Sequence, residues 1–222
     1  MFNNKYSKLL TVMLVIIIIA VVGLLCFLGY DVYKKINIKN ESEEAVSRFE
    51  EQLNKTTTDE NTDVNEVNPD LDLNTLQENT TSSSGNGVKY KGYDVIGTIE
   101  IPKTNIKYPI IKQNDVGINS LDVAICNLYG ELNKPGSNAV LVGHNYRNGT
   151  FFSNNKKLSK GDKVYITDLS GKKVTYIIYK KYETSTGDFD YATRDVGNKR
   201  EISLSTCTDD TSKRLIIWAA EE

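Results

Sequence analysis

The sequence predicts a mostly β domain, a closed barrel or a sandwich of short strands, that follows a long apolar helix and a polar spacer. Three observations lead to this prediction. Residues 9–30 contain no charged side chain, and residues 54–87 contain no aromatic one. Residues 88–222 alternate short β-branched runs with turn-forming residues. The chain of 222 residues can hold one domain of ordinary size together with such appendages.

The apolar run at residues 9–30 predicts a transmembrane anchor. As an α-helix it spans about 33 Å at about 1.5 Å per residue, enough to cross a hydrocarbon core of about 30 Å. A cleaved signal peptide is the alternative, but the run is longer than an h-region and no A-x-A-like site follows it. The short head at residues 1–8 favours a cytoplasmic N-terminus, with the rest of the chain outside the cell.

Two segments connect the anchor to the folded part. Residues 31–53 predict a juxtamembrane amphipathic helix, because apolar residues recur at helical spacing among charged ones. These apolar residues are Ala45, Val46, Phe49 and Leu53. Residues 54–87 hold seven acidic residues against Lys55 alone, with many Thr, Asn and Ser. Such a stretch cannot bury enough apolar surface to offset chain entropy, so we expect a disordered acidic spacer.

The folded unit, residues 88–222, contains seven short runs that predict β-strands. They are residues 94–101, 106–112, 139–142, 163–167, 173–182, 201–206 and 215–219. The turn at residues 168–171, DLSG, predicts a hairpin between the fourth and fifth runs. Only residues 114–129 and 151–158 are typical of helices, which argues against a parallel βαβ architecture.

Composition excludes several classes of function. Lys and Arg number 27 against 29 Asp and Glu, a balance that argues against a nucleic-acid partner. The three cysteines lack the CxxC spacing of a zinc site, and a single histidine excludes a histidine-rich metal centre. We therefore expect neither a metal nor another cofactor.

Three residues at the ends of predicted strands suit acyl transfer. Cys207 ends one strand, His144 follows another, and Arg214 precedes the last. A thiolate is a nucleophile, an imidazolium lowers the pKa of a nearby thiol and protonates a leaving amine, and a fixed cation stabilises an oxyanion. Spacing alone does not bring the three together, so a structural role for the cysteine and the histidine remains the alternative at this point.

The residues around these three resemble the motifs of sortases. SLSTC at residues 203–207, followed by Arg214, resembles the family's TLxTC…R motif, with serine where threonine is usual. VGHN at residues 142–145 resembles the family's histidine motif. IGTIEIP at residues 96–102 and YPI at 108–110 resemble its first strands. The resemblance covers nearly all of the folded unit.

The resemblance implies an eight-stranded sortase-type β-barrel with short helices. Sortases cleave a cell-wall sorting signal, commonly LPxTG-like, between Thr and Gly and hold the N-terminal part as a thioester on cysteine. An amine of the peptidoglycan cross-bridge or its lipid-linked precursor then takes the acyl group. By match of motif, Cys207 is the nucleophile, His144 the general acid and base, and Arg214 the cation that positions substrate and stabilises the oxyanion. The backbone N–H of Thr208 is expected to be a second oxyanion donor.

The resemblance also implies a location and a class. Sortases act on secreted proteins at the outer face of the Gram-positive membrane, so we expect a single-pass membrane enzyme with an extracellular catalytic domain. The interval of 63 residues from His144 to Cys207 (207 minus 144) is too short for the helical insertion of class B. Neither the lid motif nor the second membrane span of class C is expected. A class D-like or class A/E-like enzyme remains, and because Glu100 and the scattered Asp residues form no calcium motif, no metal is predicted.

Two further residues are expected to have structural roles or allow one. Cys126 is expected to be a buried thiol, and Trp218 either lines the substrate groove or packs in the core.

Two alternative functions remain. A membrane-anchored cysteine endopeptidase that hydrolyses wall peptides would share the thioester chemistry and differ only in its acceptor, water instead of an amine. A non-catalytic binding module on a stalk is the second alternative, and for it a thiol-reactive substrate mimic should fail to label Cys207.

Overall fold

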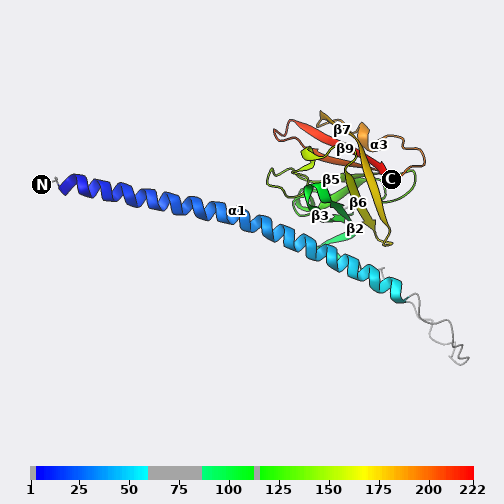
Figure 1. Cartoon of the computed structure of the whole chain (residues 1–222), viewed down its shortest axis with the longest axis horizontal. Helices are drawn as coiled ribbons and strands as arrows, with labels where there is room; N and C mark the ends of the chain where they lie inside the picture. The colour runs from blue at the N-terminus through cyan, green and yellow to red at the C-terminus, as the bar shows by residue number, and fades with distance from the viewer. Residues whose placement is uncertain (1–3, 60–86, 113–115) are drawn as a thin grey trace, which may run out of the picture. The chain divides into compact units, whose positions relative to one another are not determined.

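The computed structural model describes residues 4–59, 87–112 and 116–222 (Figure 1). The chain divides into two compact units, Met1–Glu41 and Ser42–Glu222. A single helix, α1 (Asn4–Asp59), contributes to both of them. It is continuous from the predicted anchor through the predicted juxtamembrane helix and ends six residues beyond Leu53 (59 minus 53). The remainder of the predicted spacer, residues 60–86, lies outside the described residues.

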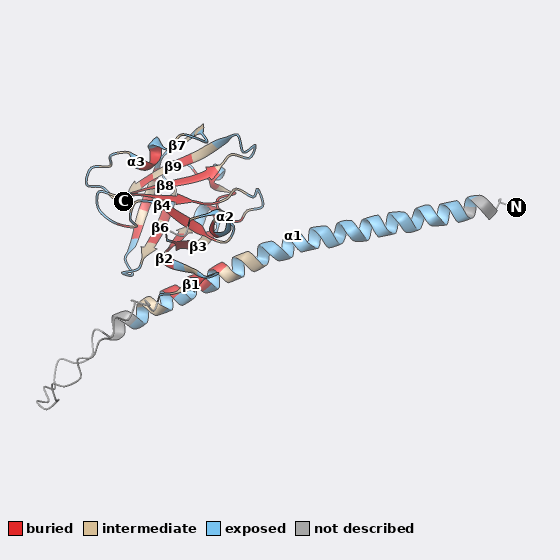
Figure 2. Cartoon of the chain, turned by 180° about the vertical axis from the view of Figure 1, so that it is seen from behind, coloured by how far each residue is buried: buried red, intermediate tan, exposed pale blue. Residues whose placement is uncertain are grey.

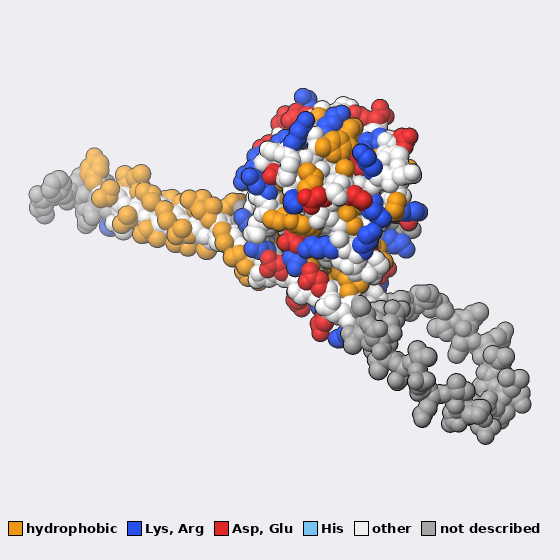
Figure 3. Space-filling model, turned by 45° about the vertical axis from the view of Figure 1, so that its right-hand side comes forward, with side chains coloured by type: hydrophobic (Ala, Val, Ile, Leu, Met, Phe, Trp, Pro, Cys, Tyr) orange, Lys and Arg blue, Asp and Glu red, His pale blue; other side chains and the backbone are white. Residues whose placement is uncertain are grey.

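The first unit is the apolar half of α1. Its large apolar side chains are exposed on all sides of the helix, with Leu10 at 72% and Ile19 at 66% exposure (Figure 3). Within the described residues, one helix segment, Lys8–Lys55, is long and apolar enough to cross a membrane. A helix that is apolar all round is typical of a lipid environment or of a protein core.

The second unit is a closed β-barrel. Among the described residues its strands are β1 (Lys89–Tyr90), β2 (Tyr93–Ile101), β3 (Ile106–Ile111), β4 (Ile125–Tyr129), β5 (Asn138–Val142), β6 (Lys163–Asp168), β7 (Lys173–Ser185), β8 (Glu201–Cys207) and β9 (Lys213–Glu221). They are ordered β1-β2-β3-β4-β5-β8-β9-β7-β6, and β6 pairs back onto β2 to close the eight strands β2 to β9. The predicted barrel is therefore confirmed, and the seven predicted strands are all present.

Two parallel pairings, β3 with β4 and β5 with β8, interrupt an otherwise antiparallel barrel. Because parallel neighbours need a crossover, the chain between β5 and β8 forms the β6–β7 hairpin and α3 (Asp190–Thr193) before it returns. The other short helices are α2 (Ile118–Leu121), η1 (Pro102–Thr104) and η3 (Asn155–Lys157). The order of pairing makes β8 the central strand between β5 and β9, which decides where the candidate site forms.

The helix predicted at residues 114–129 is wrong for most of its length. Residues 114 and 115 lie outside the described residues; in 116–129 only Ile118–Leu121 is helical, and Ile125–Tyr129 is strand β4. Ile125 and Cys126 are fully buried between β3 and β5, whose backbones supply hydrogen-bond partners on both sides. This long-range pairing overrides the local preference. Residues 151–158 likewise form turns and the single 3-10 turn of η3 instead of an α-helix.

The barrel interior is filled by aliphatic side chains that alternate along the strands, so that each strand contributes one apolar face. Fully buried members are Ile99, Ile110, Ile125, Leu141, Val164, Ile166, Ile202, Leu204 and Ile217. Figure 2 shows the buried residues concentrated on the strands. This packing gives the strand ends a rigid support.

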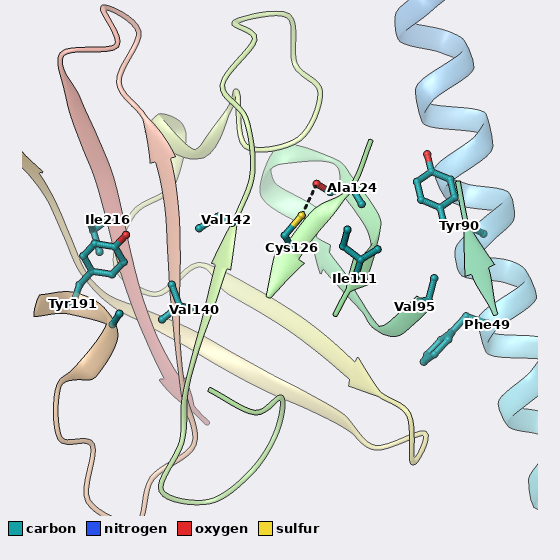
Figure 4. Packing of buried hydrophobic residues seen from close by; sticks show 12 residues of the cluster. Phe49, Tyr90, Val95, Ile111, Ala124, Cys126, Val140, Val142, Tyr191 and Ile216 are labelled. Carbon is teal, nitrogen blue, oxygen red and sulfur yellow. Dashed lines mark hydrogen bonds between the residues drawn. The ribbon is translucent and has the colours of Figure 1, made fainter. Parts of the chain in front are cut away.

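The last part of α1 packs against the barrel as a member of the second unit. Its apolar stripe includes Val46 and Phe49, which are 0% and 2% exposed, and Phe49 belongs to one buried cluster with Tyr90 and Val95 (Figure 4). At the rim of this contact, Nζ of Lys107 lies 3.1 Å from a carboxylate oxygen of Glu50. The compact unit Ser42–Glu222 therefore includes this part of the helix together with the barrel.

Phe49→Ala is expected to lower the free energy of unfolding of this unit by about 3 kcal/mol, the lower end of the cost of truncating a buried phenylalanine. The loss of unfolding free energy stays at this lower end because the helix can partly detach from the barrel in the variant. Urea unfolding followed by the fluorescence of Trp218, the single tryptophan of the chain, measures the change. Arg48→Ala, on the exposed side of the same helix, should stay within about 0.5 kcal/mol of the wild type. Equal midpoints for both variants would show that the helix does not contribute to the unit.

Candidate active site

Cys207 and Arg214 face each other across two neighbouring strands. Cys207 is the last residue of β8, Arg214 is the second residue of β9, and the two are directly paired in the antiparallel register. Residues paired in this way point to the same face of a sheet, with Cβ atoms about 4.5–5.5 Å apart. The short interval between the two residues in the sequence is thus the length of a tight β-hairpin.

His144 reaches the same end of the barrel from the other side of β8. The parallel register pairs Val142 with Ser205, so two residues further along each strand His144 comes level with Cys207. The pairing continues beyond the strand, because Gly143 donates its N–H to the carbonyl of Ser205 at 3.2 Å. Thr206 returns a hydrogen bond from its hydroxyl to the Gly143 carbonyl at 2.7 Å. The structure therefore places Cys207 on β8, Arg214 on the neighbouring β9, and His144 two residues beyond the end of β5 on the other side of β8.

Gly143 leaves room for the side chains of Ile125 and Phe152 beside the end of β5. A Cβ at this position would lie 2.6 Å from Cδ1 of Ile125 and 3.0 Å from Cδ2 of Phe152, closer than carbon atoms pack. Beyond it, Phe152 donates its N–H to the His144 carbonyl at 3.0 Å. The glycine that precedes the histidine is thus needed for the backbone path that brings His144 to the strand end.

The turn after Cys207 is organised by the carboxylate of Asp210. It accepts hydrogen bonds from the hydroxyl of Thr208 at 2.5 Å and from the N–H of Ser212 at 3.1 Å, and these bonds hold the pKa of Asp210 down at about 2. The N–H of Thr208 donates to the carbonyl of Lys213 at 3.0 Å. This N–H is engaged inside the hairpin, so it is not free to act as the second oxyanion donor that the resemblance suggested.

Asn145 links the histidine segment to this turn, a role that the sequence did not reveal. Its Nδ2 donates to the carbonyl of Cys207 at 3.0 Å and to Oδ1 of Asp209 at 2.9 Å. Asp209 also accepts from Nζ of Lys156 at 2.6 Å, and this hydrogen bond is the main reason that its pKa lies below the usual value. Asn145 directly follows His144, but no pattern in the sequence indicates a partner 62 residues further on.

A cavity of about 410 Å³ opens beside Cys207, within the usual size range of ligand clefts. Strands β7, β8 and β9 and the loops above them supply its walls. The lining residues are Asn145, Phe152, Lys156, Lys181, Glu183, Thr206, Cys207, Thr208, Asp209, Asp210, Lys213 and Leu215. Cys207 is half-buried and its thiol is free. A thiol in the wall of a mixed polar and apolar cleft is accessible to a ligand bound there.

Arg214 is oriented by the segment that follows β7. Its Nε donates to the carbonyl of Thr186 at 3.3 Å, and its guanidinium carbon lies 5.8 Å from the ring centre of Phe189. In the part of the chain that the structure describes, no carboxylate pairs with this cation. The terminal nitrogens of the guanidinium are therefore the donors that it can offer to a substrate.

Cys126 and Trp218 lie away from this site. Cys126 is fully buried, with its thiol 3.8 Å from the Ala124 carbonyl, and burial raises its pKa to about 11, which confirms the prediction of a buried thiol (Figure 4). Trp218 is absent from the lining of the cavity. Nζ of Lys180 lies 4.1 Å from the centre of its ring, and the guanidinium carbon of Arg194 lies 4.3 Å from it.

Among the described residues, no group of three or more His, Cys, Asp or Glu side chains is placed to hold a metal ion.

Comparisons with known proteins agree with the motifs. A family model described as "Sortase domain" matches residues 99–222. "Sortase A" of Bacillus anthracis is 32% identical over 126 residues, which are 55% of this chain and 58% of that relative's length. Sortase A from Corynebacterium diphtheriae is similar in structure, with a TM-score of 0.51, 28% identity, and coverage of 59% of this chain and 61% of that one. A Clostridium perfringens sortase D5 transpeptidase, at 22% identity, shares the fold, with a TM-score of 0.57 and coverage of 82% and 99%.

Proposed function

We propose, from the premise that this chain belongs to the sortase family, that it is a membrane-anchored cysteine transpeptidase. Its substrates would be secreted proteins with an LPxTG-like C-terminal sorting signal, and its acceptor an amine of the peptidoglycan cross-bridge or of its lipid-linked precursor. The observation that carries the proposal is the in-register placement of Cys207 between Arg214 and the His144 segment. Cys207 and Arg214 are cross-strand neighbours, and the backbone of the histidine segment is hydrogen-bonded to the strand that carries Cys207, which supports a shared site for the three groups.

In the proposed acylation, the thiolate of Cys207 attacks the carbonyl carbon of the scissile Thr–Gly bond. A carbon–sulfur bond forms, and the negative charge on the carbonyl oxygen is stabilised by the guanidinium of Arg214. His144, as imidazolium, gives its proton to the departing amine when the carbon–nitrogen bond breaks, and a thioester remains on Cys207. The acceptor amine then attacks the thioester, loses a proton to His144, and releases the thiolate again.

The proposed location is the outer face of a Gram-positive cell membrane, with α1 as a single-pass anchor. The exposed apolar side chains of residues 9–30 support this proposal, because in water they would be costly to leave uncovered. For the class of the enzyme we propose a class D-like or class A/E-like sortase. The support is the tight β8–β9 hairpin and the crossover between β5 and β8, whose described residues contain the β6–β7 hairpin and the short α3 but no long helix.

Mass spectrometry of products from LPxTG-like peptides tests the proposal. The full chain in detergent is incubated with peptide, alone and with increasing oligoglycine or a diaminopimelate-type amine. A transpeptidase forms an amide product in proportion to the amine, at the expense of the hydrolysed acid. Hydrolysis that no amine diverts would instead support the endopeptidase. Absence of both cleavage and an acyl adduct on Cys207, with peptide binding retained, would support the non-catalytic binding module.

A further inference from the structure

The side chain of His144 has a second neighbour besides the cysteine strand. Its Nε2 lies 3.3 Å from Oδ1 of Asp122. This nitrogen is shielded from solvent and makes no well-aligned hydrogen bond among the described residues. A buried polar atom without a partner costs about 1–3 kcal/mol, so a small rotation that completes the bond to Asp122 is favourable. Asp122 itself is half-exposed and keeps contact with water.

The fold brings Asp122 to this position through the β4–β5 pairing. The register pairs Cys126 with Val142 at one end of the ladder. Asp122 lies in the turn before β4 and Tyr146 in the segment after β5, so both residues leave the sheet at this end. The turn before β4 is closed by the N–H of Ala124, which donates to the Ser120 carbonyl at 3.0 Å. The carboxylate is therefore presented by a backbone that is fixed on both sides.

Tyr146 holds the carboxylate next to the imidazole. Its hydroxyl donates to the same Oδ1 of Asp122 at 2.6 Å, and its ring centre lies 4.8 Å from that of His144. Burial in the first place, and then the hydrogen bond to Asp122, raise the pKa of Tyr146, so the phenol remains a donor at every relevant pH. Tyrosine, aspartate and histidine thus form one compact group.

The segment behind this group is held in a strained conformation. Phe151 has φ of +47° although it is a fully buried aromatic residue, and non-glycine residues rarely adopt this region. Its ring stacks on that of Tyr108, with the ring centres 5.0 Å apart. Its ring also meets the ring of Tyr146 edge to face, with the ring centres 5.8 Å apart. Strain of this kind persists only where the surroundings over-determine it, and it is concentrated at functional sites.

We propose that Asp122 is a positioning residue for His144, which it holds through Nε2 so that Nδ1 faces the thiol and the leaving amine. This proposal rests on the proposed function for the identity of the reaction. Among the described residues, the titratable side chains recorded against the imidazole are Asp122 and Tyr146.

The chain contains one histidine, so ¹⁵N-histidine NMR of the full chain in detergent reports on His144 alone. In the wild type, we expect the neutral ring to carry its proton on Nε2, where it faces Asp122. In Asp122→Asn the share of rings with the proton on Nε2 should fall, because a neutral amide oxygen is a weaker acceptor than a carboxylate. The transpeptidation kcat should fall about 10-fold with little change in KM, part of the about 10²–10⁴-fold that acid–base catalysis contributes.

Two further variants separate positioning from structure. Asp122→Glu keeps the charge and should retain the proton on Nε2 and part of the activity, which also covers the case in which Asp122→Asn fails to fold. Glu44→Gln, an isosteric change on the exposed face of α1, should alter neither the proton position nor kcat. An unchanged proton position in folded Asp122→Asn would overturn the proposal, as would loss of the Nε2 proton in folded Asp122→Glu. If the proton position changes as expected while the wild type forms no amide product, the proposed function fails and the Asp122–His144 pairing stands.

Discussion

Cys207→Ala is expected to abolish cleavage of an LPxTG-like peptide, with a loss of about 10⁶-fold, the size seen when a catalytic nucleophile is removed. The thiol is half-buried in the cavity wall, and its replacement removes one sulfur atom without opening a cavity in the core. The barrel should therefore keep its stability, as measured by urea unfolding. Mass spectrometry should find no acyl adduct on the variant at any pH.

Cys126→Ala is the matched control for this variant. The Cys126 thiol is fully buried, and its pKa of about 11 keeps it protonated and unreactive at neutral pH. We expect most of the activity to remain, with a loss of stability of about 1 kcal/mol from the small cavity. Equal loss of turnover in the two variants would indicate that the cysteines have a structural role, and the assignment of Cys207 as nucleophile would then be wrong.

Arg214→Lys is expected to lower turnover by about 10²–10³-fold, or about 3–4 kcal/mol of barrier, the cost of one preorganised oxyanion contact. The structure supplies the reason, because Nε of Arg214 is bound to the Thr186 carbonyl and so fixes the direction of the planar fork. Lysine preserves the charge but has neither this anchoring nitrogen nor the paired terminal donors. Steady-state turnover of a sorting-signal peptide measures the loss.

Alkylation of Cys207 by a small reagent, measured against pH, separates two roles of the arginine. The reagent does not use the oxyanion site, so Arg214→Lys should be alkylated at nearly the wild-type rate. Near-normal peptide turnover in the lysine variant would show that charge alone is sufficient. A parallel collapse of alkylation and turnover would instead make Arg214 a residue that tunes the thiol, and its proposed contact with substrate would be wrong.

The strands could be predicted from the sequence where burial follows a local pattern. The hairpin of β6 and β7 has β-branched runs on both sides of a four-residue turn, and the sequence shows it directly. Strand β4 could not be predicted in this way, because its short run is a strand only by virtue of β3 and β5 beside it. Likewise the apolar stripe of residues 45–53 predicts a helix but does not reveal the barrel surface on which that helix packs.

The same distinction applies to the candidate site. Cys207, His144 and Arg214 carry reactive groups and stand in motifs, so sequence reasoning could single them out. Asp122 and Asn145 are ordinary polar residues in turns, and their importance comes from partners that lie 22 and 62 residues further along the chain (144 minus 122; 207 minus 145). Only the register of the barrel strands connects these residues to the histidine and the cysteine.

The parallel pairing of β5 with β8 has a consequence for the order in which the protein folds. It joins residues 63 positions apart (201 minus 138), whereas the β6–β7 and β8–β9 hairpins close over short turns. Long-range parallel contacts form slowly, because the entropy of loop closure must be overcome before they stabilise anything. We therefore expect the histidine segment to join the cysteine strand among the last events of folding. Until then Cys207 and Arg214 can already be neighbours on one hairpin, while the backbone of residues 142–144 is still apart from them.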